Sequence, residues 1–165
     1  MTERIVHPLK PVYDENSRVL VLGTMPSPKS REYGFYYSHP QNRFWPILTE
    51  LFGENLPKTN EDKTSLLLHH RIALWDVLQS CRIDGADDAS IHDPEPNDIA
   101  GLLAVTKIRT VFTTGTKAAA LYRRLCLKTT GVDAIALPST SPANCRHYTY
   151  EKLLAAYRVL KNYTE

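Results

Sequence analysis

The feature that most constrains the fold is the repeated alternation of short apolar segments with helical patterns. Four short segments are apolar enough to form buried strands: residues 18–22, 72–75, 108–113 and 132–137. Helical spacing or helix-capping residues occur between and after them: residues 42–52, 61–70, 98–105, 116–127 and 149–160. A short strand that is apolar on both faces is typical of a parallel sheet covered on each side. The order therefore predicts an α/β fold, with helices on both faces of a mostly parallel sheet.

Single residues give the expected bounds of these helices. Gly53 ends the helix that begins near Asn42, while Asn97 and Thr149 are expected N-caps of the helices that follow them. The segment 81–96 is rich in Asp and Pro. We expect this segment to be a polar connection.

Length and charge limit the classes of function. The chain of 165 residues suits one domain, and we expect residues 1–165 to form it. No apolar run approaches the roughly 18 residues of a membrane span, and residues 1–5 lack the pattern of a secretory signal. We therefore expect a cytoplasmic protein of bacterial type. A net charge of +2 excludes a histone-like binder but permits a DNA enzyme with a locally basic face.

The cysteines argue against metal chemistry. Cys81, Cys126 and Cys145 stand alone, and no CxxC pair is present. A disulfide framework, a zinc site and an iron–sulfur cluster are therefore not expected. Adjacent residues of a helix face different ways, and no third ligand is well spaced for the pair His69-His70. We expect neither a metal ion nor a cofactor.

Two unusual loops follow strands at the carboxyl edge of the predicted sheet. Residues 23–41 combine small residues with several aromatics, and residues 138–146 contain two prolines and several hydroxyls. Ligands of open α/β sheets bind outside the carboxyl ends of the strands. Small residues allow a ligand to approach the backbone, and aromatics offer a stacking surface for a flat ring. The sequence thus predicts a site for a planar heterocycle, although simple packing is an alternative for Trp45 and Phe44.

The second loop has a different chemistry. A stiff polar loop suits contacts to phosphates or entry into a duplex groove. Taken alone, residues 138–146 also fit a capped turn before a helix. The pairing of the two loops favours the nucleic-acid interpretation.

The motifs in these loops resemble those of the uracil-DNA glycosylase superfamily. Residues 23–27 (GTMPS) and 37–45 (YSHPQNRFW) are similar to its first motif, and residues 138–144 (PSTSPAN) to its second. The similarity covers about residues 18–160 and is greatest to the hypoxanthine (deoxyinosine) DNA glycosylases and the mismatch-specific uracil/thymine branch. It implies a three-layer α/β/α sandwich around a short four-stranded parallel sheet. It also implies base excision repair by a monofunctional glycosylase that flips a deaminated base, most closely hypoxanthine, out of double-stranded DNA. We expect such an enzyme to act as a monomer.

The resemblance also implies roles for individual residues. Around the base and the attacking water it places Gly23, Thr24, Met25, Pro26, Ser38 and Phe44, with Tyr37 as the aromatic that stacks on the base. Against DNA it places Gly115, Lys117, Ser139, Thr140, Ser141, Pro142, Asn144 and Arg146. Gly115 and Lys117 stand at a helix start, which suits a phosphate.

Two departures from the superfamily pattern favour Asn42 as the catalytic residue. Uracil-removing branches carry Asn or Asp where this chain has Met25, whose thioether does not position water. They also often carry His or Asn where this chain has Leu137. In the hypoxanthine branch the Asn of the His-Pro-x-Asn segment is thought to be catalytic, which here implies Asn42 with His39 as a partner. Its carbonyl oxygen is expected to orient water and its amino group to contact the base.

Other functions remain open at this point. The chain is an alternative candidate for a mismatch-specific uracil-DNA glycosylase, or for a catalytically weak DNA-binding relative. A nucleotide- or sugar-phosphate-binding enzyme is disfavoured because neither GxGxxG nor GxxxxGK[ST] is present. A Schiff-base lyase step is disfavoured because neither motif contains a lysine.

Overall fold

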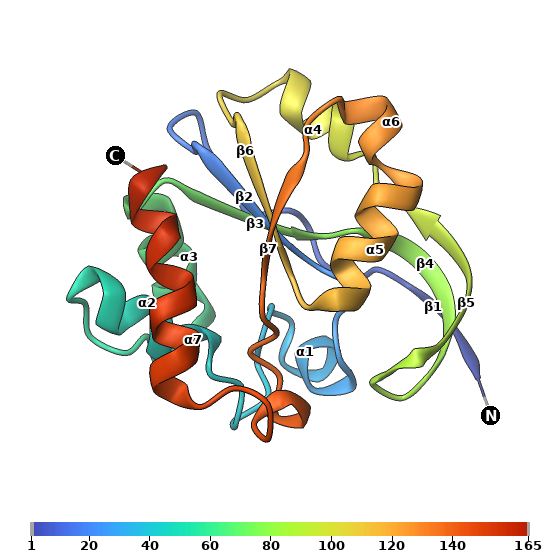
Figure 1. Cartoon of the computed structure of the whole chain (residues 1–165), viewed down its shortest axis with the longest axis horizontal. Coiled ribbons are helices and arrows are strands. Elements are labelled where there is room, and N and C mark those ends of the chain that lie inside the picture. The colour runs from blue at the N-terminus through green and yellow to red at the C-terminus, as the bar shows by residue number, and fades with distance from the viewer. Residues whose placement is uncertain (1, 165) are drawn as a thin grey trace.

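A computed structural model describes residues 2–164 and contains two sheets (Figure 1). The larger sheet is parallel and has the strand order β3-β2-β6-β7. Its strands are β2 (Val19–Gly23), β3 (Ile72–Asp76), β6 (Thr110–Thr114) and β7 (Ala134–Leu137). The four strands and the parallel sheet predicted from the sequence are confirmed, with small shifts of the bounds.

Side-chain alternation along the central strand explains why helices cover both faces of this sheet. All of β2 is buried; Val19 and Val21 pack into one apolar cluster, whereas Leu20 and Leu22 pack into another. The first cluster includes residues of α2 (Phe44–Phe52), α3 (Asn60–His69) and α7 (Tyr150–Tyr157). The second includes residues of α4 (Ile99–Ala104) and α5 (Thr116–Leu125). The expected three-layer α/β/α arrangement is therefore confirmed, and Figure 1 shows its helices on either side of the sheet.

The smaller sheet is antiparallel and was not predicted. It contains β1 (Glu3–Val6), β4 (Leu78–Asp84) and β5 (Asp87–Pro96) in the order β1-β4-β5. The prediction that residues 81–96 form only a polar connection is wrong, because these residues lie largely in the β4–β5 hairpin. Leu78, Cys81, Ile83 and Ile91 bury their side chains toward the parallel sheet while charged neighbours face solvent. One face in the core and one in water is the usual pattern of an antiparallel sheet.

Helix ends follow the capping residues, with one correction. Gly53 ends α2 in a left-handed conformation, and Thr149 caps α7 by accepting a hydrogen bond from the Lys152 amide. The N-cap of α4 is Asp98 rather than Asn97. The Asn97 amide instead donates to the carbonyl oxygens of Asp76 and Leu78 and joins the two sheets.

Short helices complete the chain. The first loop contains α1 (Pro28–Tyr33), and α6 (Leu127–Thr130) follows α5. Two 3₁₀ turns, η1 (Pro142–Asn144) and η2 (Arg158–Asn162), flank α7. None of the described helices has the length and hydropathy that a membrane span requires.

Candidate active site

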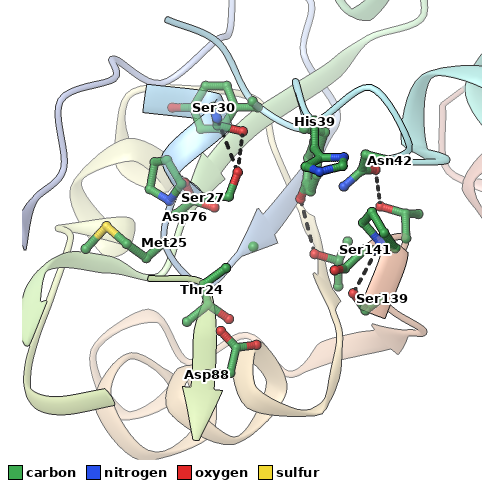
Figure 2. Close-up of a pocket in the computed structure, with 18 of the residues that line it drawn as sticks. Thr24, Met25, Ser27, Ser30, His39, Asn42, Asp76, Asp88, Ser139 and Ser141 are labelled. Atoms are coloured by element: carbon green, nitrogen blue, oxygen red, sulfur yellow. Dashed lines mark hydrogen bonds between the residues drawn. The ribbon is translucent and has the colours of Figure 1, made fainter. Parts of the chain in front are cut away.

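A cavity of about 180 Å³ opens at the carboxyl edge of the parallel sheet. The ends of β2, β3 and β6 and the loop after β7 all contribute residues to its lining (Figure 2). From β2 the chain passes to β3 on one side, and it later returns to β6 on the other side of β2. Ligands of open α/β sheets bind at such a reversal of strand order. The predicted residues that line it are Gly23, Thr24, Met25, Pro26, Tyr37, His39, Asn42, Ser139, Thr140, Ser141 and Pro142.

The floor of the cavity is crowded around Gly23. A Cβ atom at this position would lie 2.5 Å from Asp76 Oδ1 and 3.1 Å from the Tyr37 hydroxyl oxygen. Any side chain here would therefore push aside the carboxylate of Asp76, the last residue of β3. The glycine allows a carboxylate and a phenol to lie directly against the backbone of the first motif.

Tyr37 forms an aromatic wall of the cavity. Its ring stacks on that of Phe44, with ring centroids 4.1 Å apart and planes 20° from parallel. Its hydroxyl lies 3.1 Å from Thr114 Oγ1, and its backbone has the unusual φ of 54°. Burial, and then the charge of Asp76, raise the pKa of the Tyr37 hydroxyl. The ring is thus held rigidly and carries a neutral hydroxyl.

Asn42 presents a hydrogen-bond donor to the cavity. Its Oδ1 accepts hydrogen bonds from the Phe44 amide at 2.9 Å and from Thr140 Oγ1 at 2.7 Å. These two donors fix the side-chain oxygen, and the amino group donates to none of the described residues. The expectation that the Asn42 carbonyl oxygen orients water therefore disagrees with its contacts. In Figure 2 Asn42 lies beside His39, whose Nδ1 accepts from the Gln41 amide.

Three predicted residues line neither the cavity nor the groove that adjoins it. Ser38 is turned away, and its hydroxyl donates to the Phe35 carbonyl oxygen at 2.7 Å. Phe44 is fully buried and lies behind Tyr37, so it supports the aromatic wall without forming it. Arg146 is exposed and lines neither the cavity nor the adjacent groove.

The cavity also contains acidic residues that were not predicted. Asp76 ends β3 at the same sheet edge as the two loops, so its position after a buried strand was an available signal. Asp88 reaches the cavity from the β4–β5 hairpin, whose Asp-rich sequence gave no such signal. Burial raises the pKa of the Asp88 carboxyl, and the nearby Lys117 opposes this shift. Both carboxylates border the place where a ligand fits.

A groove of about 750 Å³ adjoins the cavity. Gly115, Lys117 and Asn144 line it, and Ser139 and Ser141 line both. Gly115 begins α5 without a side-chain cap, so the first amides of that helix are available to an anion. The loop after β7 is stiffened by its own hydrogen bonds, including Asn144 Nδ2 to the Ser139 carbonyl at 3.0 Å.

A separate cluster around His69 and His70 differs from the expectation that no third ligand lies near this pair. Glu54 lies near His69 and His70, and their potential ligand atoms are within 4.8 Å of one another. A third potential ligand therefore does lie near the histidine pair. His70 Nε2 is 3.1 Å from Glu54 Oε1, and its ring stacks on Phe52. This cluster lies where α3 ends, before β3 begins, whereas the cavity lies at the other end of β3.

Comparison with known proteins gives consistent relatives. Residues 10–161 match the sequence model of the uracil DNA glycosylase superfamily. A hypoxanthine DNA glycosylase of Methanosarcina acetivorans is 41% identical over 137 residues, which cover 82% of this chain and 85% of the relative. A protein of the same name from Methanosarcina barkeri is 34% identical over 138 residues, with 82% and 86% covered. A solution NMR structure from Methanosarcina acetivorans, described as a "putative Uracil DNA glycosylase", superposes with a TM-score of 0.78. It is 35% identical in sequence, and the match covers 94% of this chain and 98% of that one.

Proposed function

The chain belongs to the uracil DNA glycosylase superfamily, and we propose on this basis that it removes hypoxanthine from DNA. The observation that carries the proposal is the cavity, where the Tyr37 ring, the Asn42 amino group and the Asp76 carboxylate border one small space. A flat base requires a stacking surface together with donors and acceptors at its edge. The two relatives named hypoxanthine DNA glycosylase support this choice of base.

The reaction is hydrolysis of the N-glycosidic bond. As the bond breaks, positive charge develops on the sugar and negative charge on the departing base. Donors aimed at the base stabilise that negative charge when they are already in place. We assign this role to the Asn42 amino group and to the backbone amides of Thr24 and Met25. The Asn42 oxygen is held by Phe44 and Thr140, which leaves the amino group free to face the base. Water attacks the sugar, and His39 at the cavity wall is the candidate partner of Asn42.

Tyr37 is the proposed stacking partner of the flipped base. Its ring is backed by buried Phe44 and has little freedom to move. A stacking surface fixed in advance costs little entropy when the base arrives. The pair between hypoxanthine and cytosine lacks one hydrogen bond of a guanine–cytosine pair, so extruding hypoxanthine costs less than extruding guanine.

Double-stranded DNA is the proposed substrate, bound across the groove. The first turn of α5 with Lys117 suits a phosphate, and the loop 139–144 suits the minor groove, where it helps to fill the space left by the base. Arg146 stands exposed in the same region for a further phosphate contact. We further propose that residues 1–165 act as one glycosylase domain, as a monomer and in the cytoplasm.

The proposed enzyme releases the base without cutting the DNA backbone. A lyase step requires an amine that forms a Schiff base with the sugar. Among residues 2–164, no lysine lines the cavity; Lys117 lies in the groove. Release of the base should therefore leave an intact abasic strand.

A panel of duplexes tests the proposal directly. Each duplex carries one hypoxanthine, uracil or xanthine, and alkali-dependent strand cleavage is measured under single-turnover conditions. Hypoxanthine opposite cytosine should be removed fastest. Removal of uracil from mismatches at a higher rate would instead support a mismatch-specific uracil glycosylase. Binding to all duplexes with no release of any base would indicate a DNA-binding relative.

A further inference from the structure

Beneath the cavity, His7 and Asp76 form a buried hydrogen-bonded pair that the sequence motifs do not include. His7 Nε2 lies 2.7 Å from Asp76 Oδ2, and the two side chains are only 2% and 5% exposed. The residues belong to different sheets, since His7 follows β1 and Asp76 ends β3. The His7 backbone is itself fixed by its amide, which donates to the Gln79 carbonyl oxygen at 2.6 Å.

The surroundings of His7 keep its contact with Asp76 in either protonation state of the ring. Nδ1 lies 2.9 Å from the Leu9 carbonyl oxygen and 3.2 Å from the Leu9 amide nitrogen. A protonated ring donates to the carbonyl, and a neutral ring accepts from the amide. In both cases the proton on Nε2 is donated to Asp76. Oδ2 of the carboxylate is therefore permanently occupied.

The second carboxylate oxygen remains for a ligand. Asp76 Oδ1 lies against Gly23 and lines the cavity, and no residue in the described part of the chain donates a hydrogen bond to it. Oδ1 is consequently an acceptor whose orientation is set by the bond that His7 makes to Oδ2. A buried carboxylate is costly unless it is hydrogen-bonded, and the bond from His7 to Oδ2 meets that requirement.

Asp76 and Asn42 offer complementary groups to one base edge. Asn42 presents an amino donor, because its oxygen is already engaged, whereas Asp76 presents an acceptor. Hypoxanthine carries an N1–H donor next to the O6 acceptor on its pairing edge. Adenine carries the reverse arrangement, an N1 acceptor next to an amino donor. A fixed carboxylate therefore attracts N1–H of hypoxanthine and repels N1 of adenine.

We propose that Asp76 recognises the N1–H group of the flipped base and that His7 is the positioning residue that orients this carboxylate. The inference rests on the proposed function, because it specifies how the same cavity selects its base. The hydrogen bond from His7 also stabilises the negative charge of Asp76, which otherwise opposes the negative charge that develops on the leaving base. The smaller sheet thus has a part in base selection, because it supplies His7.

The test compares deoxyinosine with N1-methyl-deoxyinosine, which keeps O6 but replaces the N1 proton by a methyl group. Single-turnover release is measured for both bases in the same duplex. The wild type should prefer hypoxanthine by about 100-fold, the size expected when a buried polar group is left unpaired. Asp76→Ala should reduce this preference to about threefold or less, because it removes the acceptor and makes room for the methyl group.

Histidine variants separate positioning from a merely structural role. His7→Ala should lower the preference by about tenfold, whereas His7→Gln should restore most of it, because the Gln amide still donates to Asp76. His70→Ala is the matched control: it breaks a His–carboxylate pair at the opposite end of β3 and should leave the preference unchanged. Thermal melting checks that each variant is folded. If Asp76→Ala does not fold, the near-isosteric Asp76→Asn replaces it in the comparison.

The outcomes distinguish the two proposals. A wild type that releases neither base overturns the proposed function. If the wild type is active and folded Asp76 variants keep its preference for hypoxanthine, the role of Asp76 is overturned. If His7→Gln loses as much of the preference for hypoxanthine as His7→Ala does, the positioning role of the His7 hydrogen bond is overturned.

Discussion

The two sheets contribute to the cavity in different ways. The loops that follow strands of the parallel sheet supply mainly neutral groups: backbone amides after β2, the Tyr37 ring, the Asn42 amide and the hydroxyls of the loop after β7. The antiparallel sheet supplies Asp88 at its hairpin and, after its first strand, His7, which is hydrogen-bonded to the Asp76 carboxylate at the end of β3. Neutral groups hold a base by stacking and hydrogen bonding, whereas charges determine which base and how much DNA the site attracts. Variants on the two sides should therefore affect different measurements.

Asn42 should give the largest effect, on the rate of bond cleavage. Asn42→Asp keeps an oxygen for the Phe44 amide and Thr140 but removes the amino donor, so it tests the donor with little disturbance of the fold. Loss of one donor in the transition state lowers the rate by about 100- to 1000-fold. Single-turnover cleavage of a deoxyinosine duplex measures this, with DNA binding measured in parallel. Unchanged cleavage would remove Asn42 from the mechanism.

Tyr37 should give the next largest effect, on capture of the flipped base. Tyr37→Ala removes the stacking face and should weaken this step by about 10- to 100-fold, in line with the value of base–aromatic stacking. Tyr37→Phe keeps the ring and loses only the contact with Thr114, so it should remain close to wild type. Fluorescence of 2-aminopurine next to the lesion reports flipping. An unaltered signal in Tyr37→Ala would contradict the role of the wall.

Lys117 and Asp88 should shift DNA affinity in opposite directions. Lys117→Ala removes a phosphate contact and should weaken binding to all duplexes, lowering the slope of log affinity against log salt by about one. Asp88→Asn removes a negative charge beside the DNA groove and should strengthen binding by a few-fold at low salt. Titrations at several salt concentrations measure both. Shifts of the same sign would show that the charges at the antiparallel hairpin do not face the DNA.

Thiol labelling gives the smallest effect and compares the antiparallel sheet with the end of α5, a helix that covers the parallel sheet. Cys81 lies in β4 and Cys126 follows α5, and both are buried, whereas Cys145 is exposed. Burial raises the pKa of Cys126 to about 11, so its reactive thiolate is scarce at pH 8 and increases about tenfold per pH unit until that pKa is approached. At pH 8, iodoacetamide should label Cys145 first, as measured by mass spectrometry of the folded protein. Labelling of Cys81 as rapid as that of Cys145, with Cys126 still protected, would show that the antiparallel sheet opens more easily than the end of α5.

The sequence predicts the parallel sheet better than the antiparallel one for a physical reason. A buried parallel strand such as β2 is apolar at every position and is therefore visible by itself. The strands β4 and β5 bury one face only, and their Asp and Pro residues resemble a loop. The motifs indicated Gly23, Tyr37 and Asn42 because these residues lie in one continuous segment. His7 was invisible because its importance depends on a contact with a residue 69 positions away.

The bond between Asn42 and Thr140 has a consequence for how this sequence can change over time. Thr140 is almost fully buried, and its hydroxyl holds the Asn42 oxygen while its carbonyl oxygen accepts from the Arg43 amide. Replacing the threonine by a residue without a hydroxyl leaves the Asn42 oxygen held by the Phe44 amide alone, although position 140 is 98 residues away. Positions 42 and 140 should therefore vary together among relatives. In a relative with another residue at position 140 alone, the direction of the Asn42 amino donor in the cavity is fixed less firmly.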